Sequence, residues 1–224
     1  MKILALETST EYCSVALSRN GQVYDKEVYA GNRHSEILLS MIRELLTENG
    51  LTLHELDGIA FGAGPGSFTG LRIACGVAQG LAYALNLPVA GVNTLEAIAQ
   101  SIRARKIIVA LDARMSEIYH AAYDKLTDQN WQIISPPALC LPQHAPQCDG
   151  EEWQGCGSGF DLYDEILSTR YGNNLQKIYH GFRPRAKEIA QLALLKFSNG
   201  QTTDATKASP IYIRNKVALK ENER

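Results

Sequence analysis

A glycine-rich turn that runs straight into an apolar helix is the first part of this sequence whose residue types could do chemistry. The stretch is FGAGPGSFTGLRIACGVAQGLA, Phe61–Ala82. A P-loop requires GxxxxGK[ST], with a lysine that reaches the phosphates, but Gly64 is followed by Thr69 and Gly70 without a lysine. A Rossmann fingerprint requires GxGxxG, and Ser67 breaks it at the last position. Neither standard phosphate cradle is present, so only the general affinity of a helix N-terminus for anions remains.

The histidines and cysteines lack the spacing of metal or nucleophile sites. The histidines form no HxH, HxxxH or HExxH pattern, so zinc and metalloprotease chemistry have no support. The cysteines form no CxxC pair, and we interpret them as reduced thiols. Ser67 lies in no GxSxG elbow, so a serine peptidase has no support either. We predict no metal and no cofactor for this chain.

Composition and charge are those of an ordinary globular protein. The 224 residues include 45% hydrophobic and 21% charged residues, with a formal net charge of -2 and a pI of about 6.2. A protein that binds nucleic acid by itself usually has a basic patch and a basic pI, so we expect any contact with nucleic acid to be indirect. No run reaches the length of a membrane span or a signal-peptide core. We therefore expect a cytoplasmic protein without membrane contact.

The elements that must position these residues follow an α/β order that repeats once. Hydrophobic periodicity predicts strands over 2–7, 12–18, 22–29, 57–62 and 88–92 and helices over 35–48, 69–85 and 94–104. The segment KIIVALDARMSEIYHAAY from Lys106 resembles KILALETSTEYCSVAL from Lys2, which suggests a duplicated domain. Chance similarity between two amphipathic hairpins is the alternative.

The second half is less regular. We expect a strand over 131–134, a Pro- and His-rich loop over 135–148, helices over 161–171 and 186–199, and a last strand over 210–214. The whole order is similar to that of actin-like (ribonuclease-H-like, ASKHA) α/β folds. We expect an N-terminal lobe over 1–104 and a smaller C-terminal lobe over 105–224, each starting with a three-strand meander, with the last strand or tail packing back on the first lobe.

Each repeat places an acidic residue at the turn after its first strand. In actin-like ATPases these turns carry Asp-x-Gly, in which the acid helps to hold a metal and the glycine lets the backbone touch phosphate. Neither turn here has the glycine, and Arg114 puts a large side chain in its place. We interpret the turns as remnants of nucleotide loops, formed by Glu7, Thr8, Ser9, Asp112 and Arg114.

Two helices carry more apolar surface than one sheet face requires. Between Gly70 and Leu85 only Arg72 and Gln79 are strongly polar, whereas a surface helix normally has a polar face. Gly76 and Gly80 lie four residues apart, a spacing that lets another helix approach closely, although each glycine costs about 0.5–1 kcal/mol in a helix. The helix is covered either by this chain's second domain or by a helix of another chain, and we favour the second.

Five segments together resemble the bacterial TsaB (YeaZ) family: LALETSTEYCSVAL, GAGPGSFTGLRIACGVAQGLA, GVNTLEAIA, LDARMSEIYHAAY and SPIYIRNKVA. The matches extend from Lys2 to about Ala218, with a weaker middle over 129–206. The resemblance implies an actin-like fold of two lobes and a non-catalytic accessory role. According to the resemblance, the chain assists the formation of N6-threonylcarbamoyladenosine at position 37 of tRNAs that read codons starting with A.

The resemblance also implies partners. It implies a heterodimer with a related catalytic subunit, TsaD, which binds the metal and the nucleotide, and an ATPase, TsaE, that acts through the complex. It implies that the two apolar helices form the contact, and the expected interface residues are His34, Ile37, Leu38, Met41, Ile42, Leu45, Arg72, Ile73, Gly76, Val77, Gly80 and Tyr83. Without TsaD, the same patch predicts a homodimer.

One comparison with TsaD concerns its metal site. TsaD carries two metal-binding histidines in a segment like GVNHMEGH, and the resemblance aligns Gly91–Ile98 with it. Thr94 and Ile98 then stand where the histidines would be, and neither side chain can hold a catalytic metal. The alternative to the accessory role is a stand-alone actin-like ATPase or phosphotransferase, which tight binding of ATP with magnesium would support.

Overall fold

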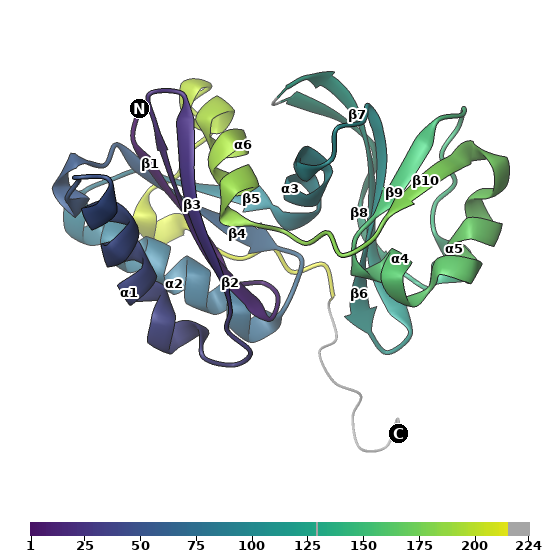
Figure 1. Ribbon diagram of the computed structural model, residues 1–224, viewed down its shortest axis with the longest axis horizontal. Helices are drawn as coiled ribbons and strands as arrows, with labels where there is room; N and C mark the ends of the chain where they lie inside the picture. The colour runs from purple at the N-terminus through teal and green to yellow at the C-terminus, as the bar shows by residue number, and fades with distance from the viewer. Residues whose placement is uncertain (129, 215–224) are drawn as a thin grey trace.

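The computed structural model describes residues 1–128 and 130–214 and contains two five-stranded mixed sheets, one in each lobe (Figure 1). The first sheet has the order β3-β2-β1-β4-β5, with β1 (Ile3–Glu7), β2 (Tyr12–Arg19), β3 (Gln22–Tyr29), β4 (Gly58–Gly64) and β5 (Val89–Asn93). The first three strands are antiparallel, and β4 and β5 run parallel to β1. Asn20 and Gly21, both at positive φ, form the two-residue turn between β2 and β3.

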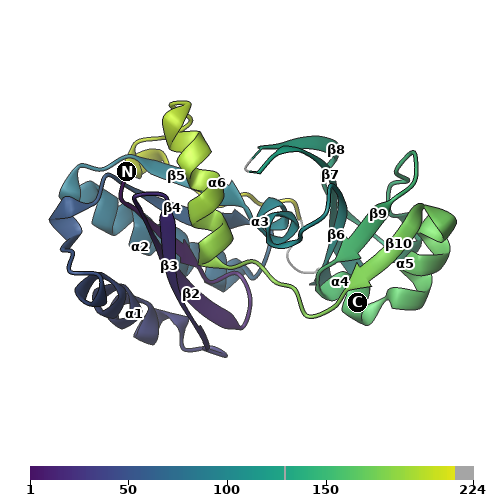
Figure 2. The same ribbon diagram turned by 45° about the horizontal axis from the view of Figure 1, so that its top comes forward.

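Helices cover both faces of the first sheet (Figure 2). On one face lie α1 (His34–Glu48) and α2 (Phe68–Leu85), and on the other lies α6 (Ala186–Ser198). Because neighbouring side chains of a strand point to opposite faces, Leu4 and Leu6 pack with α1 and α2, whereas Ile3 and Ala5 pack with α6. This two-sided burial explains why every residue of β1 is buried.

The second sheet repeats this topology, with the order β10-β9-β6-β7-β8. Its strands are β6 (Lys106–Arg114), β7 (Glu117–Thr127), β8 (Asn130–Cys140), β9 (Trp153–Cys156) and β10 (Leu175–Tyr179). The meander β6-β7-β8 is antiparallel and β9 is parallel to β6. The helices are α3 (Thr94–Ser101), which packs on α6 and β6, and α4 (Ser158–Leu162) and α5 (Asp164–Tyr171). The duplicated α/β architecture predicted from the sequence, an actin-like fold of two lobes, is confirmed.

Two expectations for the middle of the second half are wrong. The segment expected as a loop over 135–148 begins as strand, because β8 continues through Pro136 and Pro137 to Cys140. An edge strand tolerates proline, since its outer N–H groups need no ladder partner, and β8 pairs only with β7, with shifts of register. The single helix expected over 161–171 is two short helices, α4 and α5.

The C-terminal segment also differs from expectation. Residues 210–214 form no strand, although Ile211 N–H donates to the Ala63 carbonyl at 2.7 Å. Helix α6 packs across the strands of the first sheet, so the chain returns to the first lobe at Ala186, well before the expected last strand. Residues 215–224, which we had assigned to the C-terminal lobe, lie outside the described residues. No helix in the described part of the chain is both long enough and apolar enough to cross a membrane.

Candidate functional site

The glycine-rich turn packs around the first acidic turn, Glu7–Ser9, which joins β1 to β2. The Ser67 N–H donates to the Ser9 carbonyl at 2.8 Å. The Thr8 hydroxyl donates to the Gly70 carbonyl at 2.7 Å. All three residues of the acidic turn are buried, with at most 4% of each exposed. The Ser67 side chain caps α2 by accepting from the Gly70 N–H.

Close approach to the acidic turn explains the glycines of this stretch. A Cβ at Gly62 would lie 1.7 Å from Glu7 Oε2, and a Cβ at Gly70 would lie 1.9 Å from the Thr8 carbonyl oxygen. Real Cβ atoms essentially never come so close to another heavy atom. The glycines therefore accommodate the chain's own backbone and carboxyl group, and this is a packing role rather than a phosphate cradle.

The Glu7 carboxyl group is buried with only one oxygen bonded. Its Oε1 accepts from the Ser9 N–H at 2.5 Å, and its Oε2 has no hydrogen-bond partner among the described residues. Burial raises the pKa of Glu7 from 4.5 to about 7. Mg²⁺ binds ionised carboxylates and usually keeps several of its waters, so a fully buried carboxyl group that is only about half ionised near pH 7 is poorly suited to the metal-holding role that this turn has in actin-like ATPases.

Replacing this acid should change how stability depends on pH. The pKa of Glu7 is higher in the folded chain than in the unfolded one, so the folded state binds more protons between about pH 4.5 and 7. The free energy of unfolding of the wild type therefore falls as the pH rises through this window, by on the order of 3 kcal/mol. In Glu7→Gln this loss is absent, so its stability relative to wild type should increase between pH 5 and pH 8 in urea unfolding. A difference that stays constant with pH would contradict the assignment.

The second acidic turn is only partly exposed, because Asp112 is half-buried while Arg114 is exposed, and its polar groups are bonded within the chain. Asp112 Oδ1 accepts from the Arg114 N–H at 2.9 Å, and the Arg114 guanidinium lies 3.2 Å from Asp112 Oδ2. Arg214 donates to the Ala113 carbonyl at 2.9 Å and lies 2.7 Å from a carboxylate oxygen of Glu117. The C-terminal segment thus ties this turn to the first lobe. The Asp112 carboxylate is paired with the arginine that replaces the family's glycine.

The two expected positions of lost metal ligands are fully buried. The Thr94 hydroxyl donates to the Pro65 carbonyl at 2.5 Å, which links the start of α3 to the glycine-rich turn. Ile98 belongs to the hydrophobic cluster around α6. Within residues 1–128 and 130–214, no group of three His, Cys, Asp or Glu side chains could hold a metal ion.

Five of the twelve expected interface residues are part of the chain's own core. They pack with β1, β2 and α2, so they stabilise the first lobe and offer little surface to a partner. The amphipathic stripe of α1 is wide because α1 contacts both the sheet and α2. The His34 ring also contacts the Tyr12 carbonyl, with Nε2 at 3.2 Å. The five buried residues are His34, Leu38, Met41, Ile42 and Leu45.

Of the other seven expected residues, Ile37 lies on α1 and six lie on α2, where three form a face that is open in the described chain. Gly76 and Gly80 are exposed, and a Cβ at either would find nothing within 4 Å. Tyr83 is 72% exposed on the same helix. Arg72 is exposed at the start of this face, whereas Ile37, Ile73 and Val77 are half-buried. We call Gly76, Gly80 and Tyr83 the open face of α2.

Three residues near this face were not predicted as part of it. Leu39 is 56% exposed on α1. The Arg72 guanidinium lies 3.8 Å from the centre of the Phe68 ring, and its Nε donates to the Tyr212 hydroxyl at 3.0 Å. Phe68 opens α2 and could have been found from its place beside Ser67. No spacing in the sequence relates Tyr212 to Arg72, because they meet only through the tertiary fold.

Comparison with known proteins identifies the family to which this chain belongs. Residues 28–218 match the family described as TsaD, tRNA N6-adenosine threonylcarbamoyltransferase. The tRNA threonylcarbamoyladenosine biosynthesis protein TsaB of Escherichia coli (strain K12) is 36% identical over 234 residues, which cover 99% of this chain and 98% of the relative. The chain belongs to the TsaB (YeaZ) family. The TsaB of Bacillus subtilis (strain 168) is 32% identical, covering 96% of this chain and 94% of the relative.

Solved structures agree with the TsaB assignment. YeaZ from Pseudomonas aeruginosa is 37% identical, with a TM-score of 0.87, and covers 94% of this chain and 99% of that one. A second structure from the same organism, described as an uncharacterized protein with similarity to peptidase YEAZ, has a TM-score of 0.88 at 37% identity, over 95% and 99% of the two chains. The two-lobed fold of this TsaB-family chain is therefore shared with YeaZ over nearly its whole length.

Proposed function

We propose that this chain is a non-catalytic subunit that pairs with TsaD and makes TsaD competent to form N6-threonylcarbamoyladenosine at position 37 of tRNAs that read codons starting with A. TsaD would supply the metal and the nucleotide, TsaE would act through the complex, and tRNA modification would take place on TsaD. The observation that carries the proposal is the open face of α2, with two exposed glycines and an exposed tyrosine that nothing in the described chain covers.

The two glycines of this face are not required by any contact in the described part of the chain. Gly62 and Gly70 are required by atoms of the acidic turn, but Gly76 and Gly80 have open space beside them. Each costs about 0.5–1 kcal/mol of helix stability relative to alanine. Because residues four apart lie on the same side of a helix, the pair forms a flat strip along which a second helix can approach closely. Close packing against a partner helix would offset this loss of helix stability.

The contacts of Thr94 and Glu7 support a non-catalytic role. The Thr94 hydroxyl donates to the Pro65 carbonyl and Ile98 is part of the core, so the two positions that the resemblance aligns with the metal ligands of TsaD are engaged in packing. The Glu7 turn is enclosed by the glycine-rich turn rather than open to a nucleotide. The stand-alone ATPase predicts tight binding of ATP with magnesium to the isolated chain, and no contact in the structure favours it.

Co-purification with TsaD from the same organism tests the proposal. A tagged copy of this chain should retain TsaD on a column and elute with it as one complex in gel filtration. In the absence of TsaD, light scattering should give the mass of a homodimer, because an uncovered apolar face tends to self-associate. Failure to retain TsaD at micromolar concentrations of both chains would contradict the proposal.

A further inference from the structure

A groove lies at the junction of the two lobes, at the opposite end of the second sheet from the acidic turn of Asp112. It has a volume of about 850 Å³ and is bounded by the segment after α3, the tip of the β7–β8 hairpin and the first turns of α6. It lies beside Lys106, where β6 begins, and this nine-residue strand ends at Arg114. At about 3.3 Å per residue, the groove is roughly 25 Å from that turn.

The side chain of Gln100 forms hydrogen bonds that connect the walls of the groove. Gln100 Nε2 donates to the Asp128 carbonyl of the hairpin at 2.7 Å and to Gln191 Oε1 of α6 at 3.4 Å. Gln100 Oε1 accepts from the indole N–H of Trp131 at 2.7 Å. Three elements distant in the sequence are thus joined in the folded chain, and the groove is formed before any ligand arrives.

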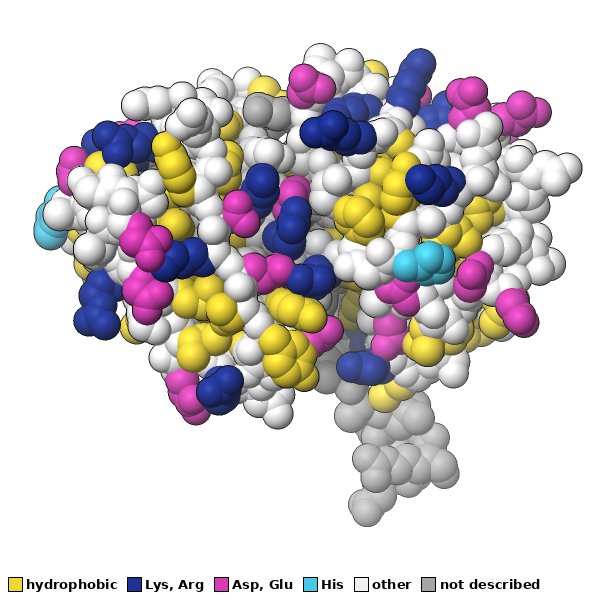
Figure 3. Space-filling view, viewed as in Figure 1, with side chains coloured by type: hydrophobic (Ala, Val, Ile, Leu, Met, Phe, Trp, Pro, Cys, Tyr) yellow, Lys and Arg dark blue, Asp and Glu magenta, His cyan; other side chains and the backbone are white. Residues whose placement is uncertain are grey.

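The groove is basic although the chain as a whole is slightly acidic. Two acidic side chains line it, against five basic ones, which are Arg103, Arg105, Lys125, Arg185 and Lys187. Figure 3 shows Lys and Arg side chains along the junction of the lobes and above it. The formal net charge of the chain is -2, so the positive charge is concentrated here and is not a general property of the surface.

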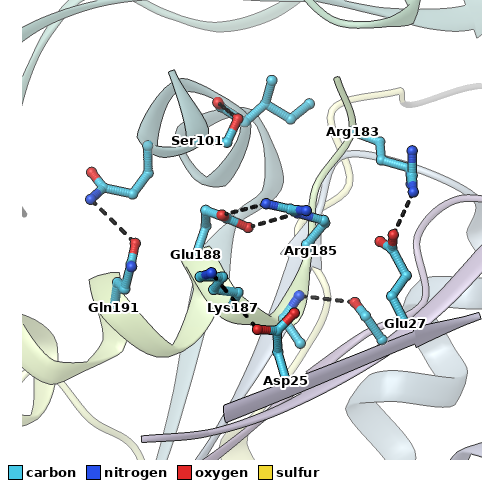
Figure 4. A network of polar contacts seen from close by, with 12 residues as sticks. Asp25, Glu27, Ser101, Arg183, Arg185, Lys187, Glu188 and Gln191 are labelled. Atoms are coloured by element: carbon cyan, nitrogen blue, oxygen red, sulfur yellow. Dashed lines mark hydrogen bonds and ion pairs between the residues drawn. The ribbon is translucent and has the colours of Figure 1, made fainter. Parts of the chain in front are cut away.

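Of these cations, one has no ion pair in the described chain and two have only weak ones. Arg103 is exposed and has no ion pair within the described ranges. Lys125 and Lys187 lie 3.9 and 3.8 Å from carboxylate oxygens, which are long, weak pairs. In Figure 4, Arg185 is instead held by Glu188 at 3.0 Å, which fixes this wall of the groove.

Lys187 lies where a cation is intrinsically disfavoured. It is the second residue of α6, and the N-terminus of a helix carries a partial positive charge. An anion bound in the groove would offset both the charge of Lys187 and the partial positive charge of the helix N-terminus. A second hollow of about 370 Å³ shares Arg105 with the groove and adds Lys106, Glu152 and two glutamines, so it extends the polar surface without adding net charge. None of the lining residues of either hollow is aromatic, so the surface has no platform on which a base could stack.

We propose that this groove binds phosphate groups and that their source is the backbone of an RNA rather than a free nucleotide. Phosphate contacts position an RNA without reading its bases, which fits a basic surface without aromatic side chains. The length added by the second hollow fits a polymer better than a single nucleotide. The inference rests on the proposed function only for the choice of tRNA as the RNA, and it replaces the expectation that this chain contacts tRNA only indirectly.

Fluorescence anisotropy with a labelled tRNA transcript and the isolated chain tests the groove. Arg103→Gln/Lys125→Gln should weaken binding at 50 mM KCl by about tenfold or more, and should reduce the slope of log affinity against log salt by about 1.5 to 2. Arg33→Gln/Lys207→Gln removes two exposed cations elsewhere that lack ion pairs in the described chain, and should stay within about twofold of wild type. Arg103→Gln/Lys187→Gln provides a second groove variant, and thermal melting by circular dichroism shows whether each variant is folded.

The outcomes separate the sources of phosphate. Equal losses in groove and control variants, or no loss in either groove variant, would overturn the proposal. A second arm titrates ATP and inorganic phosphate. If these lose affinity in the groove variants while tRNA binding is unchanged, an RNA source is wrong. Since TsaD is absent from these measurements and the groove variants should still retain TsaD on a column, a failure here is distinct from a failure of the heterodimer.

Discussion

Gly76→Leu/Gly80→Leu is expected to abolish the complex with TsaD while leaving the chain folded. Nothing lies within 4 Å of a Cβ at either position, so the added side chains point into solvent in the isolated chain. Leucine is a better helix former than glycine by somewhat less than 1 kcal/mol per position, so the melting temperature should rise. In a complex, two isobutyl groups would separate the helices that the glycines allow to approach. We expect affinity for TsaD to fall by about a hundredfold or more, as binding titration would measure.

A matched variant separates this effect from added hydrophobicity. Thr169→Leu adds a similar exposed side chain on α5, in the other lobe, and should bind TsaD like the wild type. If Gly76→Leu/Gly80→Leu also binds within about threefold of wild type, the open face of α2 is not the contact. The buried residues of α1 are unsuitable for this test, because their replacement would unfold the first lobe.

Gly70→Ala is expected to destabilise the chain by about 3 kcal/mol or more. The new Cβ would lie 1.9 Å from the carbonyl oxygen of Thr8. Both groups belong to the backbone, so no side-chain rotation relieves the clash, and the acidic turn or the start of α2 must move. The same movement breaks the bond from the Thr8 hydroxyl to the Gly70 carbonyl. Urea unfolding measures the loss directly.

Gly80→Ala is the control for this prediction, since it is the same substitution in the same helix. Its Cβ meets no atom within 4 Å, so we expect an increase in the free energy of unfolding of about 0.5–1 kcal/mol. A lower free energy of unfolding for Gly70→Ala and a higher one for Gly80→Ala would support a packing role for Gly70 and an open position for Gly80. Changes of the same sign and size in the two variants would refute this difference.

Most of the fold could be predicted from the sequence because local signals and global topology agree. The run Ile3–Leu6 is apolar enough for a strand buried on both faces, and Asn20-Gly21 specifies the hairpin that follows it. The repeat at Lys106 then predicts the second meander. Predictions fail where long-range packing decides, as in β8, which stays a strand through two prolines because it lies at an edge.

The candidate site could be predicted only in part. Hydrophobic periodicity identifies α1 and α2 as strongly apolar, but it does not say whether the sheet, the neighbouring helix or another chain covers each residue. Met41 and Leu45 therefore looked like interface residues although they are core. The roles of Gly62 and Gly70 depend on Glu7 and Thr8, which are more than fifty positions away, and no local pattern relates these pairs.

Reconstituted tRNA modification tests the central claim most directly. The other proteins of the modification system, TsaD and TsaE among them, would be incubated with unmodified tRNA and the substrates of the reaction, with and without this chain. The account predicts modified adenosine only when this chain is present, and none with Gly76→Leu/Gly80→Leu. Equal modification without this chain would contradict the account.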